Sequence, residues 1–317
     1  MQDNDLHPGQ STSRGQLISH SAEPPPQEEA LLQAVRARLR ATASGADAHV
    51  DELLALVDEL WTFALGRFLL INRGLNAEWA HQMVTHPWGT LAKESTPALQ
   101  YALFESMPSL LATRERFGIF RQQLQALLRP GITLASIPCG WMGELLLLDY
   151  RECPGVRLIG IDLDPEALEG ARRLASQHGL DGQLSLQLDD AWAPGEAASV
   201  DVLTSNGLNI YEPDDERVVA LYGRFYERLR PGGTLVTSAL TPPPGVSAES
   251  PWNLDAVDAE GLRLQTLVLA EIVQVAISFR THAQTREQLE RAGFVDVRFI
   301  DDSACAFPTV IARKPAD

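Results

Sequence analysis

The sequence predicts an α/β protein in which a doubly wound parallel sheet follows an N-terminal helical region. Beyond Pro130-Gly131, seven short apolar runs alternate with helical patterns, and such alternation is typical of βαβ units. Between 28 and 128, apolar residues recur at helical spacing. The first 27 residues are polar and end in Pro24-Pro25-Pro26. We therefore expect a disordered tail over 1–27, a helical cap domain over 28–128 and a sheet domain over 129–317.

The expected strands cover 132–138, 157–162, 184–188, 199–205, 233–240, 295–301 and 305–312. Helical patterns at 165–179 and 215–230 separate some of them, and a further apolar helix is expected over 262–277. Because crossovers between parallel strands are right-handed, this order predicts an active site at the carboxyl ends of the strands.

Composition excludes several classes of partner. The 317 residues carry a formal net charge of −16, and so acidic a surface repels nucleic-acid phosphates. No apolar stretch reaches the roughly 18 residues of a membrane span, and the N-terminus lacks the pattern of a secretory signal. The three cysteines, at 139, 153 and 305, argue against a zinc site and favour a reducing cytoplasm. We expect a cytoplasmic protein with no metal, nucleic-acid or membrane partner.

Two glycines, Gly140 and Gly143, follow the first expected strand. A strand, a glycine-bearing turn and a helix together expose backbone N–H groups and allow a ligand to approach the main chain closely. Many such turns contain glycine for steric reasons alone. This element indicates a binding site only together with others.

The second expected strand ends in Ile161-Asp162-Leu163-Asp164-Pro165. A carboxylate there, about 20 residues after a glycine turn, can accept hydrogen bonds from a ribose diol. The alternative is a helix cap, because Asp164 precedes a proline at the first helical position. Both can hold, with Asp162 as the ribose ligand and Asp164 as the cap.

Polar residues also follow the third and fourth expected strands. The third is followed by Asp189-Asp190-Ala191-Trp192, which could bind an adenine amino group and ring or be an ordinary acidic turn. The fourth is followed by polar residues over 204–214, next to the point where the strand order reverses. A cluster at that position indicates a site rather than packing.

The order of these elements resembles the class I S-adenosylmethionine (SAM)-dependent methyltransferases, from about 117 to 315. The resemblance depends on the glycine turn, the acidic end of strand two, the DDAW and SVDVLTSNGLN segments, and LYGRFYERLRPGGTLVTS. The last segment, a helix that ends in Leu-Arg-Pro-Gly-Gly before a strand, is the most specific. The resemblance implies a seven-stranded Rossmann-like methyltransferase sheet with one antiparallel strand, and SAM as the methyl donor.

The resemblance also implies roles for matching residues. Gly140 and Gly143 would face the methionyl part of SAM, Asp162 its ribose, Asp190 with Ala191 or Trp192 its adenine, and Asn206 and Gly207 its sulfonium. Pro138, Cys139 and Leu163 complete the predicted cofactor residues.

The first turn departs from the family pattern. Ser136 and Pro138 stand where an acidic residue and the first glycine are usual, and the last glycine is displaced. Binding of the methionine amino group is therefore expected to be rearranged, with Glu144 or the helix near Arg116 as candidates.

Methyl transfer from a sulfonium needs mainly orientation of the acceptor, and a base only when the nucleophile arrives protonated. The candidate catalytic residues are Asn209, Tyr211 and His282, and the candidate substrate-binding residues are Tyr211, Trp252 and Arg280. For each of these, packing is the alternative. A helical cap suits a small enclosed acceptor. Two other functions stay open as alternatives: a SAM-binding protein without turnover and a protein methyltransferase. A homodimer is also possible.

Overall fold

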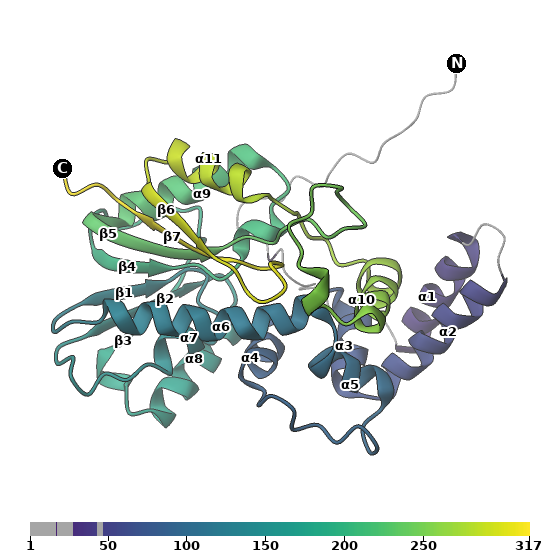
Figure 1. The fold of residues 1–317 in the computed structure, drawn as a ribbon. Helices are drawn as coiled ribbons and strands as arrows, with labels where there is room; N and C mark the ends of the chain where they lie inside the picture. The colour runs from purple at the N-terminus through teal and green to yellow at the C-terminus, as the bar shows by residue number, and fades with distance from the viewer. Residues whose placement is uncertain (1–16, 18–27, 43–46) are drawn as a thin grey trace.

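Seven strands form one mixed sheet (Figure 1). It is seen here in a computed structural model, which describes residue 17 and residues 28–42 and 47–317. The strand order is β3-β2-β1-β4-β5-β7-β6, and β7 alone runs antiparallel to its neighbours. The strands are β1 Thr133–Ser136, β2 Arg157–Asp162, β3 Leu184–Leu188, β4 Val200–Thr204, β5 Leu229–Ser238, β6 Val295–Ile300 and β7 Thr309–Arg313. The predicted doubly wound sheet is confirmed.

Strand β5 begins earlier than its expected range of 233–240. Leu229 pairs with Val200, and Thr234 pairs with Val202, so the register shifts between these two pairs. Extra residues on one strand of a pair form a bulge. The Pro231-Gly232-Gly233 segment lies in this irregularity, and the sequence had placed it between the helix and the strand.

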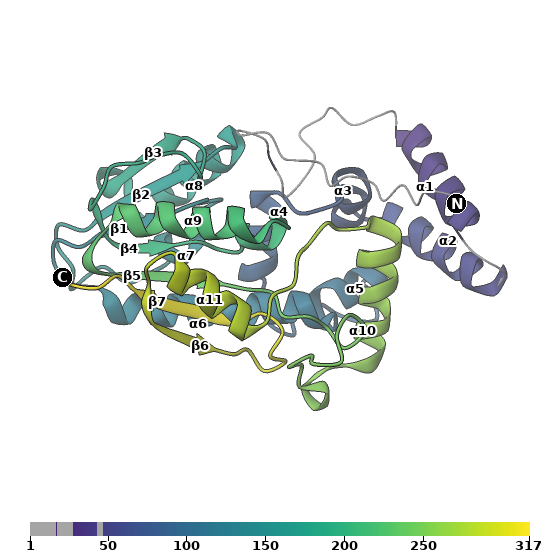
Figure 2. The same cartoon turned by 90° about the horizontal axis from the view of Figure 1, so that it is seen from above.

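Helices cover both faces of the sheet (Figures 1 and 2). One face packs against α6 Pro108–Leu127, α7 Gly143–Leu146 and α8 Pro165–Gln177, and the other against α9 Asp215–Arg228 and α11 His282–Arg291. Neighbouring strand residues belong to opposite faces: Leu134 lies in the first cluster and Ala135 in the second. The central strands β1 and β4 are buried on both sides, which explains their short apolar runs.

The remaining helices lie beside the sheet (Figure 2). They are α1 Glu28–Thr42, α2 Asp47–Trp61, α3 Ala64–Asn72, α4 Ala77–Thr85 and α5 Ala98–Glu105. Their apolar cluster also contains residues from the segment after β5, where α10 Ala259–Gln265 leads into a π-helical stretch over Thr266–Val273. Arg38 Nη1 donates to the carbonyl of Glu271 over 3.0 Å, and Arg73 Nε donates to that of Val273 over 3.2 Å. The cap therefore combines two distant parts of the chain.

Helix α6 connects this cap to the sheet. Its residues Phe120 and Leu124 are buried in the cluster under the sheet, and Ala112 packs beside the loops after β4 and β5. The division into domains at 28 and 129 stays a prediction. The expected disorder of 1–27 falls outside the described residues except at Leu17. No helix in the described ranges has the length and apolar character to cross a membrane.

Candidate functional site

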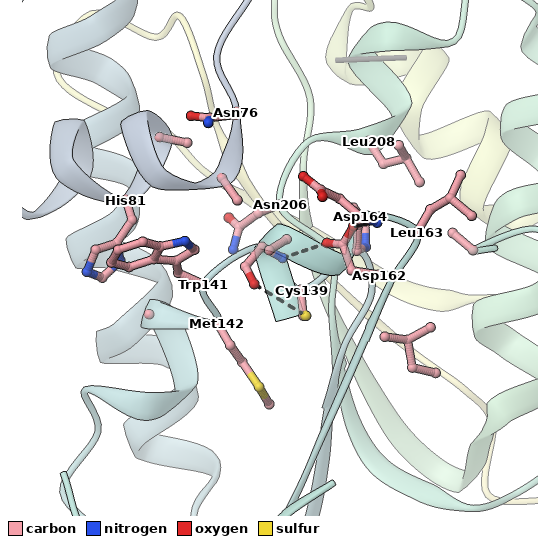
Figure 3. A pocket seen from close by; sticks show the side chains of 18 of the residues that line it. Asn76, His81, Cys139, Trp141, Met142, Asp162, Leu163, Asp164, Asn206 and Leu208 are labelled. Carbon is pink, nitrogen blue, oxygen red and sulfur yellow. Dashed lines mark hydrogen bonds between the residues drawn. The ribbon is translucent and has the colours of Figure 1, made fainter. Parts of the chain in front are cut away.

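A cavity lies at the carboxyl ends of β1, β2 and β4, between the sheet and helices α4 and α6. Strands β1 and β4 are neighbours from which the chain proceeds in opposite directions, so the cavity lies at the switch point of the sheet. Figure 3 shows side chains of the strand loops, such as Cys139, Asp162 and Asn206, opposite His81 of α4 and Asn76, which caps that helix.

The turn after β1 is fastened to the end of β2. The backbone N–H of Cys139 donates to the carbonyl of Ile161 over 2.9 Å, and that of Gly140 donates to Asp162 Oδ2 over 2.8 Å. Gly140 has a φ of +53°, a conformation that side chains rarely adopt. A glycine adopts this conformation without strain, and the main chain lines the cavity at this point.

Asp162 and Asp164 divide two tasks. Asp162 is 8% exposed and lines the cavity, and its Oδ1 accepts from the N–H of Asp164 over 3.0 Å. Burial raises the pKa of Asp162. Asp164 accepts from the N–H of Glu166 over 2.9 Å and caps α8, which confirms the cap. Asp162 keeps spare lone pairs on both carboxylate oxygens, as a ribose ligand requires.

The loop after β3 forms the next wall of the cavity. Asp189, Asp190, Ala191 and Trp192 all line it. Asp190 Oδ1 accepts from the N–H of Trp192 over 2.9 Å, so the segment is also a side-chain-stabilised turn. Trp192 Nε1 donates to the carbonyl of Arg217 over 3.0 Å, which fixes the indole beside the cavity.

Glu144 brings a carboxylate to the end of β1. It is 3% exposed, and its Oε1 accepts from Ser136 Oγ over 2.5 Å and from Thr204 Oγ1 over 2.8 Å. Ser136 and Thr204 pair across β1 and β4, so their hydroxyls converge on one oxygen. Burial raises the pKa of Glu144.

Arg116 of α6 is the cationic counterpart. It is 5% exposed, lines the cavity, and its Nη1 donates to Asn206 Oδ1 over 2.5 Å and to Ser238 Oγ over 3.3 Å. Its guanidinium carbon lies 4.1 Å from the centroid of the Phe307 ring. Burial lowers the pKa of Arg116 to about 10, so the side chain is charged at neutral pH.

The structure collects most of the sequence-predicted residues. All predicted cofactor residues except Gly207 line the cavity: Pro138, Cys139, Gly140, Gly143, Asp162, Leu163, Asp190, Ala191, Trp192 and Asn206. Tyr211 lines it as well, and burial raises the pKa of its hydroxyl. Gly207 has a φ of +84° and starts the 3-10 turn that holds Tyr211. The individual ligand roles stay predictions.

Four predicted catalytic or substrate residues are not among the cavity-lining residues. Asn209 is buried at 2% exposure. His282 binds Asp301 over 2.9 Å, and Trp252 Nε1 donates to Thr241 Oγ1 over 3.1 Å. Arg280 is only 4% exposed, and all three of its guanidinium nitrogens have acceptors: Asp215 Oδ1 and the carbonyls of Asn209 and Glu212. Hydrogen bonds within the protein thus hold His282, Trp252 and Arg280 away from the cavity. Both polar side-chain atoms of Asn209 are buried without a hydrogen-bond partner among the described residues. The catalytic and substrate roles of these four residues stay predictions.

Helix α4 contributes residues that sequence reasoning missed. Asn76, Ala77, Ala80, His81 and Val84 line the cavity. The spacing 77, 80, 81, 84 is one helical face, and its two alanines permit close approach to the turn after β1. His81 packs on Trp141 with ring centroids 5.0 Å apart, and burial lowers the pKa of the imidazole. This face, with its two alanines, was the sequence feature that could have predicted contact between α4 and the cavity.

Comparisons with known proteins agree with this geometry. A family model described as a methyltransferase domain matches residues 136–233, from the last residue of β1 into β5. The nocamycin O-methyltransferase of Saccharothrix syringae is 30% identical over 177 residues, which are 54% of this chain and 61% of that protein. The demethylmenaquinone methyltransferase of Thermus thermophilus is 33% identical over 103 residues, 32% of this chain and 44% of that one. The chain thus spans less than two thirds of either relative.

One solved structure is similar over nearly its whole length. It is described as a possible exported protein from Bordetella parapertussis, with a TM-score of 0.84 and 54% identity over 91% of this chain and 96% of that one. At this coverage the similarity extends beyond the sheet into the helical cap.

Proposed function

We propose that this chain is a class I SAM-dependent methyltransferase, which transfers a methyl group from SAM to a small molecule bound under the helical cap. The observation that carries the proposal is the hydrogen bond between Gly140 and Asp162, which joins two of the family's binding elements within one cavity. The loops after β3 and β4 meet at the same cavity.

The cavity residues fit SAM. Asp162 offers a carboxylate whose orientation is held by two backbone donors. Ala191 and Trp192 offer apolar surface for an adenine ring beside the carboxylate of Asp190. Glu144 and Arg116 supply opposite charges at the other end. When bound, SAM supplies an electrophilic methyl group on a sulfonium.

The chain's own residues would then orient the acceptor and exclude water. Tyr211 keeps its proton, because burial raises the pKa of its hydroxyl, so it can donate a hydrogen bond to an acceptor but is poorly suited as a base. His81 is neutral near pH 7, because burial lowers its pKa, and its imidazole can accept a proton from an acceptor hydroxyl. His81 is therefore a better candidate base than His282.

A small acceptor is supported by the position of the cavity between the sheet and helices α4 and α6. The relative from Saccharothrix syringae is named an O-methyltransferase, which favours an oxygen nucleophile over a nitrogen or carbon nucleophile.

The test is donor binding followed by turnover. Calorimetry should show that SAM and S-adenosylhomocysteine bind and that NAD does not. A panel of small hydroxylated acceptors should then be screened for S-adenosylhomocysteine release, with protein omitted as the control. Binding of NAD in place of SAM would refute the proposal, and SAM binding without release on any acceptor would favour a binding protein without turnover.

We also propose the cytoplasm as the compartment, on the basis of the free cysteines 139, 153 and 305. The Bordetella parapertussis protein carries a different description, as possibly exported. Fractionation of cells that express the tagged full chain would decide between the two, and a periplasmic or secreted product would contradict the cytoplasmic proposal.

A further inference from the structure

Glu144 has an unfilled position for a cation. Its Oε1 is occupied by the hydroxyls of Ser136 and Thr204. The second oxygen, Oε2, accepts no hydrogen bond from a side chain of the described residues, and Glu144 lines the cavity. A buried carboxylate is costly unless a positive charge or further donors compensate it.

Arg116 has an unfilled position for an anion. Its Nη1 donates to two neutral oxygens, of Asn206 and Ser238, and its buried Nε has no acceptor among the described residues. No carboxylate of residues 28–42 or 47–317 lies within ion-pair distance of its guanidinium. The aromatic ring of Phe307 shields this cation from water but does not neutralise it.

Two opposite buried charges thus line one cavity without forming an ion pair with each other. A ligand that carries an ammonium and a carboxylate on the same carbon would compensate both charges at once, because each charged group would then have a hydrogen-bonded partner. The arrangement is complementary to an α-amino acid group.

We infer that Glu144 binds the ammonium and Arg116 the carboxylate at the methionyl end of SAM, so that a carboxylate on helix α7 replaces the acidic residue missing from β1. This inference rests on the proposed function. Ser136, which stands in the usual acidic position, holds the relocated carboxylate through its hydroxyl. In the altered first turn, the carboxylate that binds the ammonium is then moved from β1 to α7 and is not lost.

The position of Glu144 in the sequence assigns the amino acid group to the methyl donor rather than to the methyl acceptor. Glu144 follows Gly143 directly at the start of helix α7, which begins where the turn ends whose Gly140 contacts Asp162. A ligand that extends from Asp162 along this turn reaches Glu144. Arg116 contacts Asn206, the residue predicted to lie beside the sulfonium.

Three adenosine thioethers separate the contributions by calorimetry on the full chain. S-adenosylhomocysteine carries both charged groups, the aminopropyl thioether of adenosine carries only the ammonium, and methylthioadenosine carries neither. Glu144→Gln keeps the shape and an acceptor for Ser136. The exposed Glu152→Gln is the matched control, and the melting temperature of each ligand-free variant reports folding.

Glu144→Gln should weaken binding of S-adenosylhomocysteine and of the aminopropyl thioether by about ten- to a hundredfold, the effect of one charged hydrogen bond. Methylthioadenosine should bind as it does to the wild type. Arg116→Gln should weaken only S-adenosylhomocysteine, and Arg116→Lys should restore part of the loss.

The outcomes are distinguishable. If the wild type binds none of the three ligands, the proposed function fails. If the wild type binds them but Glu144→Gln leaves S-adenosylhomocysteine unaffected, only the inference is overturned. Equal weakening of all three ligands would also overturn it, because Glu144 would then be a structural residue. Should Arg116→Gln fail to fold, Arg116→Lys with the same ligands decides the carboxylate assignment.

Discussion

The backbone N–H of Gly140 donates to Asp162 Oδ2 over 2.8 Å, and this bond joins the turns after the first two strands of the sheet. The other oxygen of Asp162 accepts from the N–H of Asp164 over 3.0 Å. A carboxylate held on both oxygens is fixed in orientation before a ligand arrives. Such preorganisation lowers the cost of ordering the site on binding.

Replacing this carboxylate should weaken donor binding. Asp162→Ala removes an acceptor for ribose hydroxyls, and a hydrogen bond to a charged group contributes about 1.5–3 kcal/mol. The dissociation constant for SAM should therefore rise by about one to two orders of magnitude, as measured by calorimetry. Asp255→Asn, on an exposed loop, is the control. Unchanged affinity in folded Asp162→Ala would assign the ribose to another residue.

Gly143 should tolerate no side chain. A Cβ there would lie 2.8 Å from His81 Nδ1 and 3.4 Å from Phe117 Cζ. Gly143→Ala should reduce the free energy of unfolding by about 1–3 kcal/mol, as overpacking does, and weaken SAM binding by displacing α4. Urea unfolding measures the first effect.

The contact with His81 is tested by a double-mutant cycle. Adding His81→Ala should recover much of the stability that Gly143→Ala loses, because the clashing ring is gone. Gly118→Ala is the matched control: a Cβ there meets nothing within 4 Å. An alanine in the helix interior should stabilise by about 0.5–1 kcal/mol. Strict additivity of the two substitutions would refute the proposed clash.

His81 should give stability a pH dependence on the acidic side. Burial lowers the pKa of His81 below its ordinary 6.5, so the unfolded chain binds the proton more readily than the folded chain. This contribution to the free energy of unfolding is complete above about pH 6.5 and is lost as pH falls through the folded pKa. His81→Gln should therefore flatten the pH profile of urea unfolding just below pH 6.5. The exposed His178→Gln should leave the profile as in the wild type.

Replacing Arg280 should lower the free energy of unfolding. Arg280→Leu removes the guanidinium that donates to the carbonyls of Asn209 and Glu212 and to Asp215 Oδ1, which should cost about 1.5–3 kcal/mol of unfolding free energy. The exposed Arg313→Leu should change it far less. A raised KM for the acceptor with wild-type stability would instead support the predicted substrate role.

The predictions from the sequence were most accurate for features that depend on residues adjacent in the chain. Asp164 caps α8 as its local sequence predicted, and the ribose role of Asp162 stays a prediction. The position of Arg280 near the strand ends was also foreseeable, but the direction of its side chain depends on carbonyls about 70 residues away along the chain. His81 was missed for the same reason, because the approach of α4 to the turn after β1 is a long-range contact. Glu144 was foreseen as a candidate since it follows that turn directly.

The shared core of the cap has a consequence for synthesis on the ribosome. Helices α1 to α5 bury their apolar faces partly against residues 267–273, and Arg38 and Arg73 bind carbonyls there. Those partners emerge only after β5 has been translated. Helices α1 to α5 therefore lack part of their packing partner while the central strands are synthesised, and some of their apolar surface stays exposed. We expect chaperones that bind nascent chains to bind this surface.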